Sequence, residues 1–259
     1  MERAFLLFLE FDGTEFCGWQ RQAQGRSVQM VVEDALSELA GSTRKSVAAG
    51  RTDAGVHAVS LPITVAMPER WTCADLLRAV NAVLPGDVAV REVRAVADGT
   101  DARRSATGRR YQYDIGVDRS SRSPWRARRE WPLGRPLAVD AMETATGAVL
   151  GSHDFRAFAT VGPPKPHYDC TVIEAAWQRI DDSSVRFVIA ADRFLHHMVR
   201  MLVGTLVDIG LERRPGSDID ALLARRDNHD TSPPAPAGGL SFVAAQYPDT
   251  CLLAERAAW

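Results

Sequence analysis

The segment AAGRTDAGVHA, residues 48 to 58, has the residue types and spacing that could do chemistry. It places one acid, Asp53, among small residues, with Arg51 two positions before it and His57 four positions after it. The residues alone leave three interpretations open. Asp53 could cap the turn at Gly55, it could share a metal ion with His57, or it could be a reactive carboxylate that a nearby cation keeps ionised.

A metal site at this segment has little support in the sequence. Catalytic zinc is normally held by three protein ligands, and no third ligand stands at a useful spacing from Asp53 and His57. His196 and His197 are adjacent, so on a helix their side chains would point in different directions. The four cysteines are scattered without a C-x-x-C pair, and no cofactor motif occurs. We therefore expect no metal, no cofactor and four reduced thiols.

The composition is typical of a globular protein. Of the 259 residues, 46% are apolar and 25% are charged, which suits one large domain or two smaller ones. No run of eighteen apolar residues occurs, and the apolar stretch at the N-terminus is too short for a secretory signal. We expect a cytoplasmic protein with no membrane partner.

Arginine dominates the basic residues and clusters in one stretch. The formal net charge is only -2, but 29 of the 31 basic residues are arginines. Nine of them stand between Arg103 and Arg129 against Asp114 and Asp118, which gives that stretch a local charge of +7. Because the planar guanidinium group binds phosphate well, the cluster favours an anionic partner over a merely solvated surface.

Apolar periodicity predicts strands and helices in both halves of the chain. A buried strand is expected over 4–11, followed by a helix that Ser27 caps and Gly41 ends. The second half predicts a strand over 109–117, a long loop over 118–136, a helix over 139–151 and a hairpin of 170–180 with 184–191. A long helix over 194–210, a helix near 217–226 and a last strand over 240–248 complete it. The absence of regular βαβ alternation favours an α+β fold.

Several segments together resemble one family. From about residue 5 to 248, the chain is similar to the tRNA pseudouridine synthase A family, whose motifs it carries in the same order: FDGTEFCGWQRQ, SVQMVVEDAL, GRTDAGVHA, NAVLP, ARRSATGRRYQY, GSHDFRAF, FLHHMVRMLVGTLVDIG and APAGGLSFVAAQYP. The resemblance implies the pseudouridine synthase fold. That fold has two similar α+β halves, a central, mostly antiparallel sheet flanked by helices, and an active-site cleft between the halves. We expect the halves at 1–105, with the aspartate loop, and 106–259, with the RRYQY strand and the FLHHMVR helix.

The resemblance also implies roles for individual residues. Asp53 matches the nucleophile, and Arg200 in FLHHMVR matches the basic residue that pairs with it. Tyr111 in GRRYQY matches the tyrosine that stacks on the target uracil and is suited to assist proton transfer. Arg51 matches an arginine that helps to flip the base, and Leu195 matches an apolar wall of the pocket. The remaining predicted RNA contacts are Arg103 and Arg109.

The implied activity is the isomerisation of uridine to pseudouridine in tRNA, at positions 38 to 40 of the anticodon stem-loop, by a homodimer without cofactor or metal. Two alternatives stay open: the same chemistry on another, specialised RNA, or RNA binding without catalysis. Phe11 stands where the family usually has tyrosine, and Thr100 and Asp101 stand where it usually has Phe-His. These departures concern the choice of RNA more than the reaction.

Overall fold

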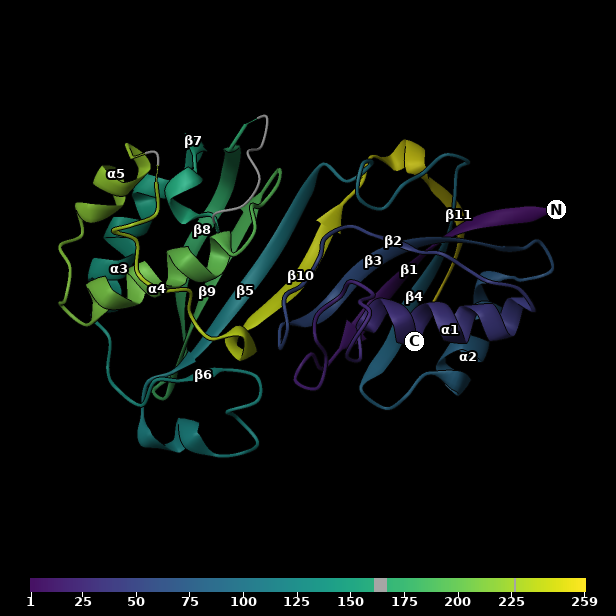
Figure 1. Cartoon of the computed structure of the whole chain (residues 1–259), viewed down its shortest axis with the longest axis horizontal. Coiled ribbons are helices and arrows are strands. Elements are labelled where there is room, and N and C mark those ends of the chain that lie inside the picture. Colours follow the sequence, from purple (N-terminus) through teal and green to yellow (C-terminus); the bar gives the residue numbers. More distant parts are fainter. Residues whose placement is uncertain (161–166, 226) are drawn as a thin grey trace. The chain divides into compact units, whose positions relative to one another are not determined.

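The computed structural model describes residues 1–160, 167–225 and 227–259. The chain divides into two compact units, one formed by Met1–Gly108 with Phe242–Trp259 and the other by Arg109–Ser241 (Figure 1). Both units combine helices with strands that pair almost entirely antiparallel, so the predicted α+β fold class is confirmed. Within the described residues, no helix is long and apolar enough to cross a membrane.

The first unit is a sheet covered by two helices. Its central strand β1 pairs antiparallel with β3 on one side and with β4 on the other, in the strand order β11-β4-β1-β3-β10, and β2 pairs with β3. The helix α2 packs on β4 and α1 packs beside α2 (Figure 1). The elements are β1 (Glu2–Phe11), α1 (Val28–Ala40), β2 (Val47–Ala48), β3 (His57–Pro68), α2 (Cys73–Val83), β4 (Val88–Val96), β10 (Leu240–Gln246), η5 (Asp249–Cys251) and β11 (Leu252–Ala258).

Local signals in the sequence placed the first elements well. The strand β1 confirms the expectation for 4–11, and its core side chains Phe5, Leu6, Leu7 and Leu9 are fully buried. The helix α1 begins after Ser27, whose side chain accepts a hydrogen bond from the N–H of Met30. It ends at Gly41, which has the left-handed conformation (φ 70°) that glycine adopts without strain. Both predicted ends of this helix are therefore confirmed.

In the second unit, the helices pack against the strands that continue the order of the sheet. The order is β5-β9-β8-β7 with antiparallel pairing, and the short β6 pairs parallel with β5. The helix α3 packs on α4 and on β8. The elements are β5 (Gly108–Gly116), η1 (Arg119–Arg122), β6 (Trp131–Pro132), α3 (Val139–Thr146), η2 (Gly147–Val149), β7 (Gly151–Asp154), η3 (Arg156–Phe158), β8 (Asp169–Asp181), β9 (Ser184–Ala191), α4 (Met198–Gly210), α5 (Asp218–Leu223) and η4 (Ala237–Gly239).

Three predicted elements of the second half differ from the structure. The helix expected over 194–210 begins only at Met198, because His197 has a left-handed backbone (φ 64°) that a continuous helix cannot contain. The helix expected over 139–151 ends as an α-helix at Thr146 and continues as the 3-10 turn η2. The helix near 217–226 is the short α5, and residue 226 lies outside the described residues.

Candidate active site

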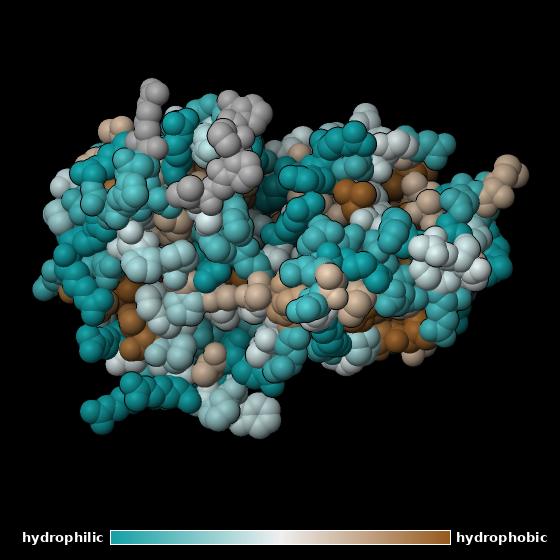
Figure 2. Space-filling model, viewed as in Figure 1, coloured by the Kyte–Doolittle hydropathy of each residue, from teal (hydrophilic) through white to brown (hydrophobic). Residues whose placement is uncertain are grey.

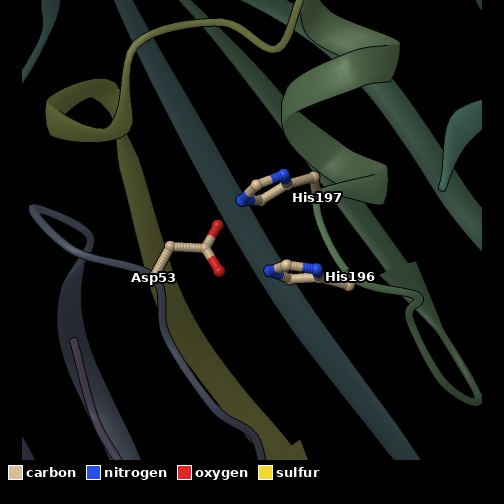
Figure 3. A group of neighbouring side chains, drawn as sticks. All are labelled: Asp53, His196 and His197. Carbon is tan, nitrogen blue, oxygen red and sulfur yellow. The ribbon is translucent and has the colours of Figure 1, made fainter. Parts of the chain in front are cut away.

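Asp53 lies in the loop between β2 and β3, on the first unit. Its side chain is half-buried, Thr52 beside it is buried, and Arg51 is exposed. The loop closes as a turn in which the N–H of Val56 donates to the backbone carbonyl of Asp53 at 3.1 Å, with Gly55 in the left-handed conformation (φ 78°). Figure 3 shows the carboxylate projecting from this loop ahead of β3. The turn that the sequence predicted is present, and the bond that closes it uses the backbone of Asp53.

A second segment, residues 12–19 (DGTEFCGW), holds the backbone of this loop, and we call it the bracing segment. The N–H of Trp19 donates to the carbonyl of Thr52 at 3.0 Å, and the N–H of Gly55 donates to the carbonyl of Phe16 at 3.3 Å. Trp19 itself is buried in the core. Because these bonds run from backbone to backbone, they fix the course of the loop on both sides of Asp53.

The two glycines of the bracing segment allow this close approach. A Cβ atom on Gly13 would lie 2.0 Å from the carbonyl oxygen of Val56. Gly18 has a φ of 103°, and a Cβ atom there would lie 2.7 Å from the carbonyl oxygen of Thr52. No other residue fits at either position without displacing the loop that carries Asp53. The bracing role of this segment was not predicted from the sequence, although its two glycines beside aromatic residues were the available signal.

His57 joins the loop to the bracing segment from inside the core. The N–H of Gly13 donates to Nδ1 of His57 at 3.0 Å, and the same nitrogen lies 3.4 Å from Oδ1 of Asp12. The side chain is buried, with 5% of its residue surface exposed. In the neutral ring, Nδ1 is therefore the acceptor and Nε2 carries the proton. These contacts give His57 a structural role, because they join the start of β3 to the bracing segment.

An ion pair between Arg26 and Asp87 lies next to the bracing segment, which is itself hydrogen-bonded to the turn before β4. The Arg26 guanidinium donates to both carboxylate oxygens of Asp87, at 2.9 Å for one of them, and lies 4.1 Å above the ring of Phe16. The N–H of Asp12 donates to the backbone carbonyl of Asp87 at 3.0 Å. The hydrogen bonds from Arg26 hold the pKa of Asp87 below its usual value, and partial burial acts in the opposite direction.

On the second unit, Tyr111 occupies the middle of β5. It stands opposite Ile189 of β9 and makes an edge-to-face contact with Phe194, with ring centroids 5.0 Å apart and an angle of 83°. Only 9% of its surface is exposed. Tyr113 is fully buried and donates its hydroxyl to the carbonyl of Pro236 at 2.6 Å, and burial raises its pKa well above the usual value. The two tyrosines of RRYQY therefore have different surroundings.

The segment before α4 corrects an expectation about its two histidines. His196 and His197 do not point in different directions: their rings stack with centroids 4.0 Å apart and 30° between the planes (Figure 3). The left-handed backbone of His197 permits this arrangement. Thr160 fixes it from another part of the unit, with its hydroxyl 2.7 Å from Nδ1 of His197 and its N–H donating to the carbonyl of His196 at 3.1 Å.

Arg200 lies in the first turn of α4 and is half-buried. Its Nε donates to the carbonyl of Ala235 at 2.7 Å, and the N–H of Ala235 donates back to the carbonyl of Arg200 at 2.9 Å. A Cβ atom on Gly204 would lie 2.2 Å from the carbonyl oxygen of Pro233, so the segment from Pro233 to Ala235 passes directly over α4. Leu195, with 6% of its surface exposed, packs just ahead of this turn.

The two remaining predicted contacts, Arg103 and Arg109, lie on different units. Arg103 is exposed in a turn where the side chain of Asp101 accepts hydrogen bonds from the N–H groups of Arg103 and Arg104, at 2.9 and 2.8 Å. Burial acts to raise the pKa of Asp101, but these hydrogen bonds outweigh it and the pKa lies below its usual value. Arg109, on β5, donates to the carbonyl of Asp192 at 2.9 Å.

The predicted site residues are divided between the two units. The first unit carries Arg51, Asp53 and Arg103, and the second carries Arg109, Tyr111, Leu195 and Arg200.

Comparisons with known proteins agree with one another. A family model described as tRNA pseudouridine synthase matches residues 8–103 and 145–248, which include Asp53 and Arg200 but not Tyr111. The protein named tRNA pseudouridine synthase A from Myxococcus xanthus is 38% identical over 243 residues, covering 94% of this chain and 91% of its own. Proteins of the same name are 41% identical in Moorella thermoacetica, over 92% of this chain and 97% of theirs, and 40% identical in Thermus thermophilus, over 95% and 98%.

Proposed function

The chain belongs to the tRNA pseudouridine synthase family, and from this premise we propose that it converts uridine to pseudouridine in tRNA, with Asp53 as the nucleophile. The resemblance inferred from the sequence motifs, and with it the isomerase class, is confirmed. The observation that carries the proposal is that the first stretch matched by the family model contains the Asp53 loop together with its bracing segment.

The proposed reaction is an isomerisation in which all atoms are retained. The N1–C1′ bond of uridine breaks, the uracil turns, and a C5–C1′ bond forms. The hydrogen on C5 is lost as a proton and N1 acquires one, so the reaction needs neither oxidant nor reductant. Asp53 supplies a carboxylate that adds to C6 of the uracil or acts at C1′ of the ribose. The tight backbone bonding around Asp53 supports this role, because a nucleophile must be held in position.

The other predicted residues complete the proposed site. Tyr111 offers a ring on which the flipped uracil stacks, and its hydroxyl assists proton transfer. Arg200 supplies a positive charge to Asp53, and Leu195 forms an apolar wall. Arg51, Arg103 and Arg109 bind the RNA backbone through their guanidinium groups. The exposure of Arg51 and Arg103 supports this assignment, because phosphates approach from solvent. In this proposal, residues 1–105 contribute the nucleophile, and residues 106–259 contribute the stacking ring and the counter-charge.

We further propose that the enzyme acts in the cytoplasm as a homodimer, needs no metal, and modifies positions 38 to 40 of the anticodon arm. The same chemistry on another RNA is the alternative, and the substitutions Thr100 and Asp101 beside Arg103 are the feature that favours it. The side chain of Asp101 accepts hydrogen bonds from two backbone N–H groups of its own turn. Its negative charge is therefore held in place beside Arg103.

Unmodified tRNA transcripts, incubated with the enzyme and mapped by carbodiimide-dependent primer extension, test the proposal. The wild-type enzyme should produce stops at positions 38 to 40. Asp53→Asn should lower the rate by on the order of 1000-fold or more, because the nucleophile is removed while the loop keeps its shape. Asp98→Asn, an exposed aspartate in another loop of the same unit, is the matched control and should behave as wild type. Product from Asp53→Asn at the wild-type rate would exclude Asp53, and no product from any tRNA would exclude the proposed substrate.

A further inference from the structure

The loop between β5 and β6, residues 118–130, exposes an aromatic ring among arginines, and we call it the Arg–Trp loop. The indole of Trp125 is 92% exposed, the highest value among the described large apolar residues after the terminal Met1. The same loop carries four exposed arginines: Arg119, Arg122, Arg128 and Arg129. A large ring held in water in this way is the kind of feature that marks an interaction surface.

The exposure of Trp125 is imposed by a loop that is firmly bonded from within. Asp118 accepts hydrogen bonds from the N–H and the hydroxyl of Ser120, at 3.0 and 2.8 Å, and Ser121 is fully buried. The N–H of Ala127 donates to the carbonyl of Ser123 at 2.8 Å, which closes a turn around Trp125. The indole therefore projects from a fixed backbone, and it can bind a ligand without first ordering the loop.

Arg126 turns inward and leaves the outer face of the loop basic. Its guanidinium lies 2.7 Å from the carboxylate of Glu130 and 3.7 Å from that of Asp118, and it also donates to the hydroxyl of Ser184 at 2.9 Å. Both acids of the loop are thus paired with the one arginine that is not exposed. Five arginines against two acids give residues 118–130 a charge of +3, carried by the outward side chains. Figure 2 shows the hydrophilic atoms of this projecting lower edge.

We propose that the Arg–Trp loop is a contact for RNA, in which an unstacked base of the tRNA lies on Trp125 and the arginines hold the flanking phosphates. This rests on the proposed function and extends it to a contact away from the reacting uridine. Every base has a face that stacks on an indole, and the guanidinium fork matches phosphate, so ring and arginines together suit a single-stranded stretch. The loop lies outside the residues matched by the family model, so the contact is not part of the matched family pattern.

Two other occupants fit the surface less well. A second copy of the chain, packed by a two-fold axis on this patch, would bring its own four arginines against those of the first. A membrane surface would need an apolar face to insert, and Trp125 is the only exposed large apolar residue of this loop. RNA fits both features, because its bases can stack on the indole ring and its phosphates can pair with the arginines.

Equilibrium binding of a labelled tRNA transcript by fluorescence anisotropy tests the proposal. Trp125→Ala should raise Kd by roughly 5- to 100-fold, as expected for one lost base stack, and Trp125→Phe should restore most of the affinity. The double variant Arg122→Gln/Arg129→Gln should lower the slope of log K against log salt by about 1.4–1.8, because two phosphate contacts are lost. Trp259→Ala, which removes another exposed tryptophan (66%), and Arg78→Gln on α2 are the matched controls and should leave Kd unchanged.

The assay separates this proposal from the proposed function. Binding is measured without turnover, so a loss of affinity in Trp125→Ala supports the loop contact even for an RNA that the enzyme does not modify. Pseudouridine formation at saturating tRNA should keep its wild-type rate in Trp125→Ala, since this residue is not in the proposed catalytic site. A Kd within twofold of wild type overturns the proposal. So does a variant whose tRNA affinity is unchanged while it loses binding to phosphatidylglycerol vesicles, or loses self-association in sedimentation velocity.

Discussion

The backbone N–H of Gly13 donates a hydrogen bond to Nδ1 of His57 at 3.0 Å and so joins two segments that lie 44 residues apart in the chain. One segment is the bracing segment, and the other is the start of β3, four residues after Asp53. Because both groups are buried, neither can exchange its partner for water. The position of the proposed nucleophile therefore depends on a hydrogen bond between two residues that take no part in the proposed reaction.

Replacement of His57 should separate its hydrogen-bonding role from its volume. His57→Leu leaves the buried N–H of Gly13 without an acceptor, which should lower the free energy of unfolding by about 1–3 kcal/mol more than His57→Asn, whose amide oxygen can take the place of Nδ1. Urea denaturation measures this difference. Pseudouridine formation at 20 °C should fall further in the leucine variant. Equal stability of the two variants would show that the Gly13–His57 bond contributes nothing.

Two glycines with positive φ should respond very differently to alanine. Gly18 faces the carbonyl of Thr52, and a Cβ atom there would lie 2.7 Å from that oxygen, whereas a Cβ atom on Gly41 would meet nothing within 4 Å. Gly41→Ala should lower the free energy of unfolding by the backbone strain alone, about 1 kcal/mol, and should keep full activity. Gly18→Ala should cost about 3 kcal/mol or more and should also lower kcat, because the Asp53 loop must move. Thermal unfolding and initial rates test the pair, and wild-type kcat in Gly18→Ala would contradict the bracing role.

The Arg26–Asp87 pair should make stability depend on pH in the acid range. Because the folded-state pKa of Asp87 is lowered, its contribution is fully present above the unfolded pKa, about 3.9, and is lost as the pH falls through the lower folded value. The difference in unfolding free energy between wild type and Asp87→Asn should be about 1 kcal/mol near pH 6, since both groups are partly exposed and screened. It should shrink below pH 4. A difference that stays constant down to pH 3 would mean that the pairing is not electrostatic.

The sequence predicted those parts of the fold that depend on local bonds. Ser27 and Gly41 define the ends of α1 through hydrogen bonds within five residues, so a reading of the local sequence was sufficient. The start of α4 depends instead on His197, whose left-handed backbone is held by Thr160 from 37 residues away. No periodic pattern reports such a contact, and the apolar spacing therefore extended the helix too far.

The same division applies to the candidate site. Residue types and the motif order were enough to select Asp53, Tyr111 and Arg200 as candidates, and their roles stay predictions. The contacts that hold their surroundings join distant segments, such as the Arg200 guanidinium with the carbonyl of Ala235. The edge strand β11 was also missed, because a half-exposed strand lacks the buried alternation that marks an interior one.

The role of the Tyr111 hydroxyl can be tested against a control on the same strand, because Tyr113 lies two residues away on β5. Tyr111→Phe keeps the ring contact with Phe194 and the surface for stacking, so tRNA affinity and stability should change little. The rate at saturating tRNA should fall by roughly 100-fold if the hydroxyl assists proton transfer. Tyr111→Ala should lose affinity as well, and about 3 kcal/mol of stability, because the buried ring is removed.

Tyr113→Phe should give the opposite result to Tyr111→Phe, with lower stability and an unchanged rate. It removes the hydrogen bond to the carbonyl of Pro236 and should cost about 1 kcal/mol of stability without affecting kcat. Single-turnover kinetics with urea unfolding distinguish the two tyrosines on one strand. If Tyr111→Phe kept the wild-type rate, the hydroxyl of Tyr111 would have no part in proton transfer, and the ring alone would explain the proposed role.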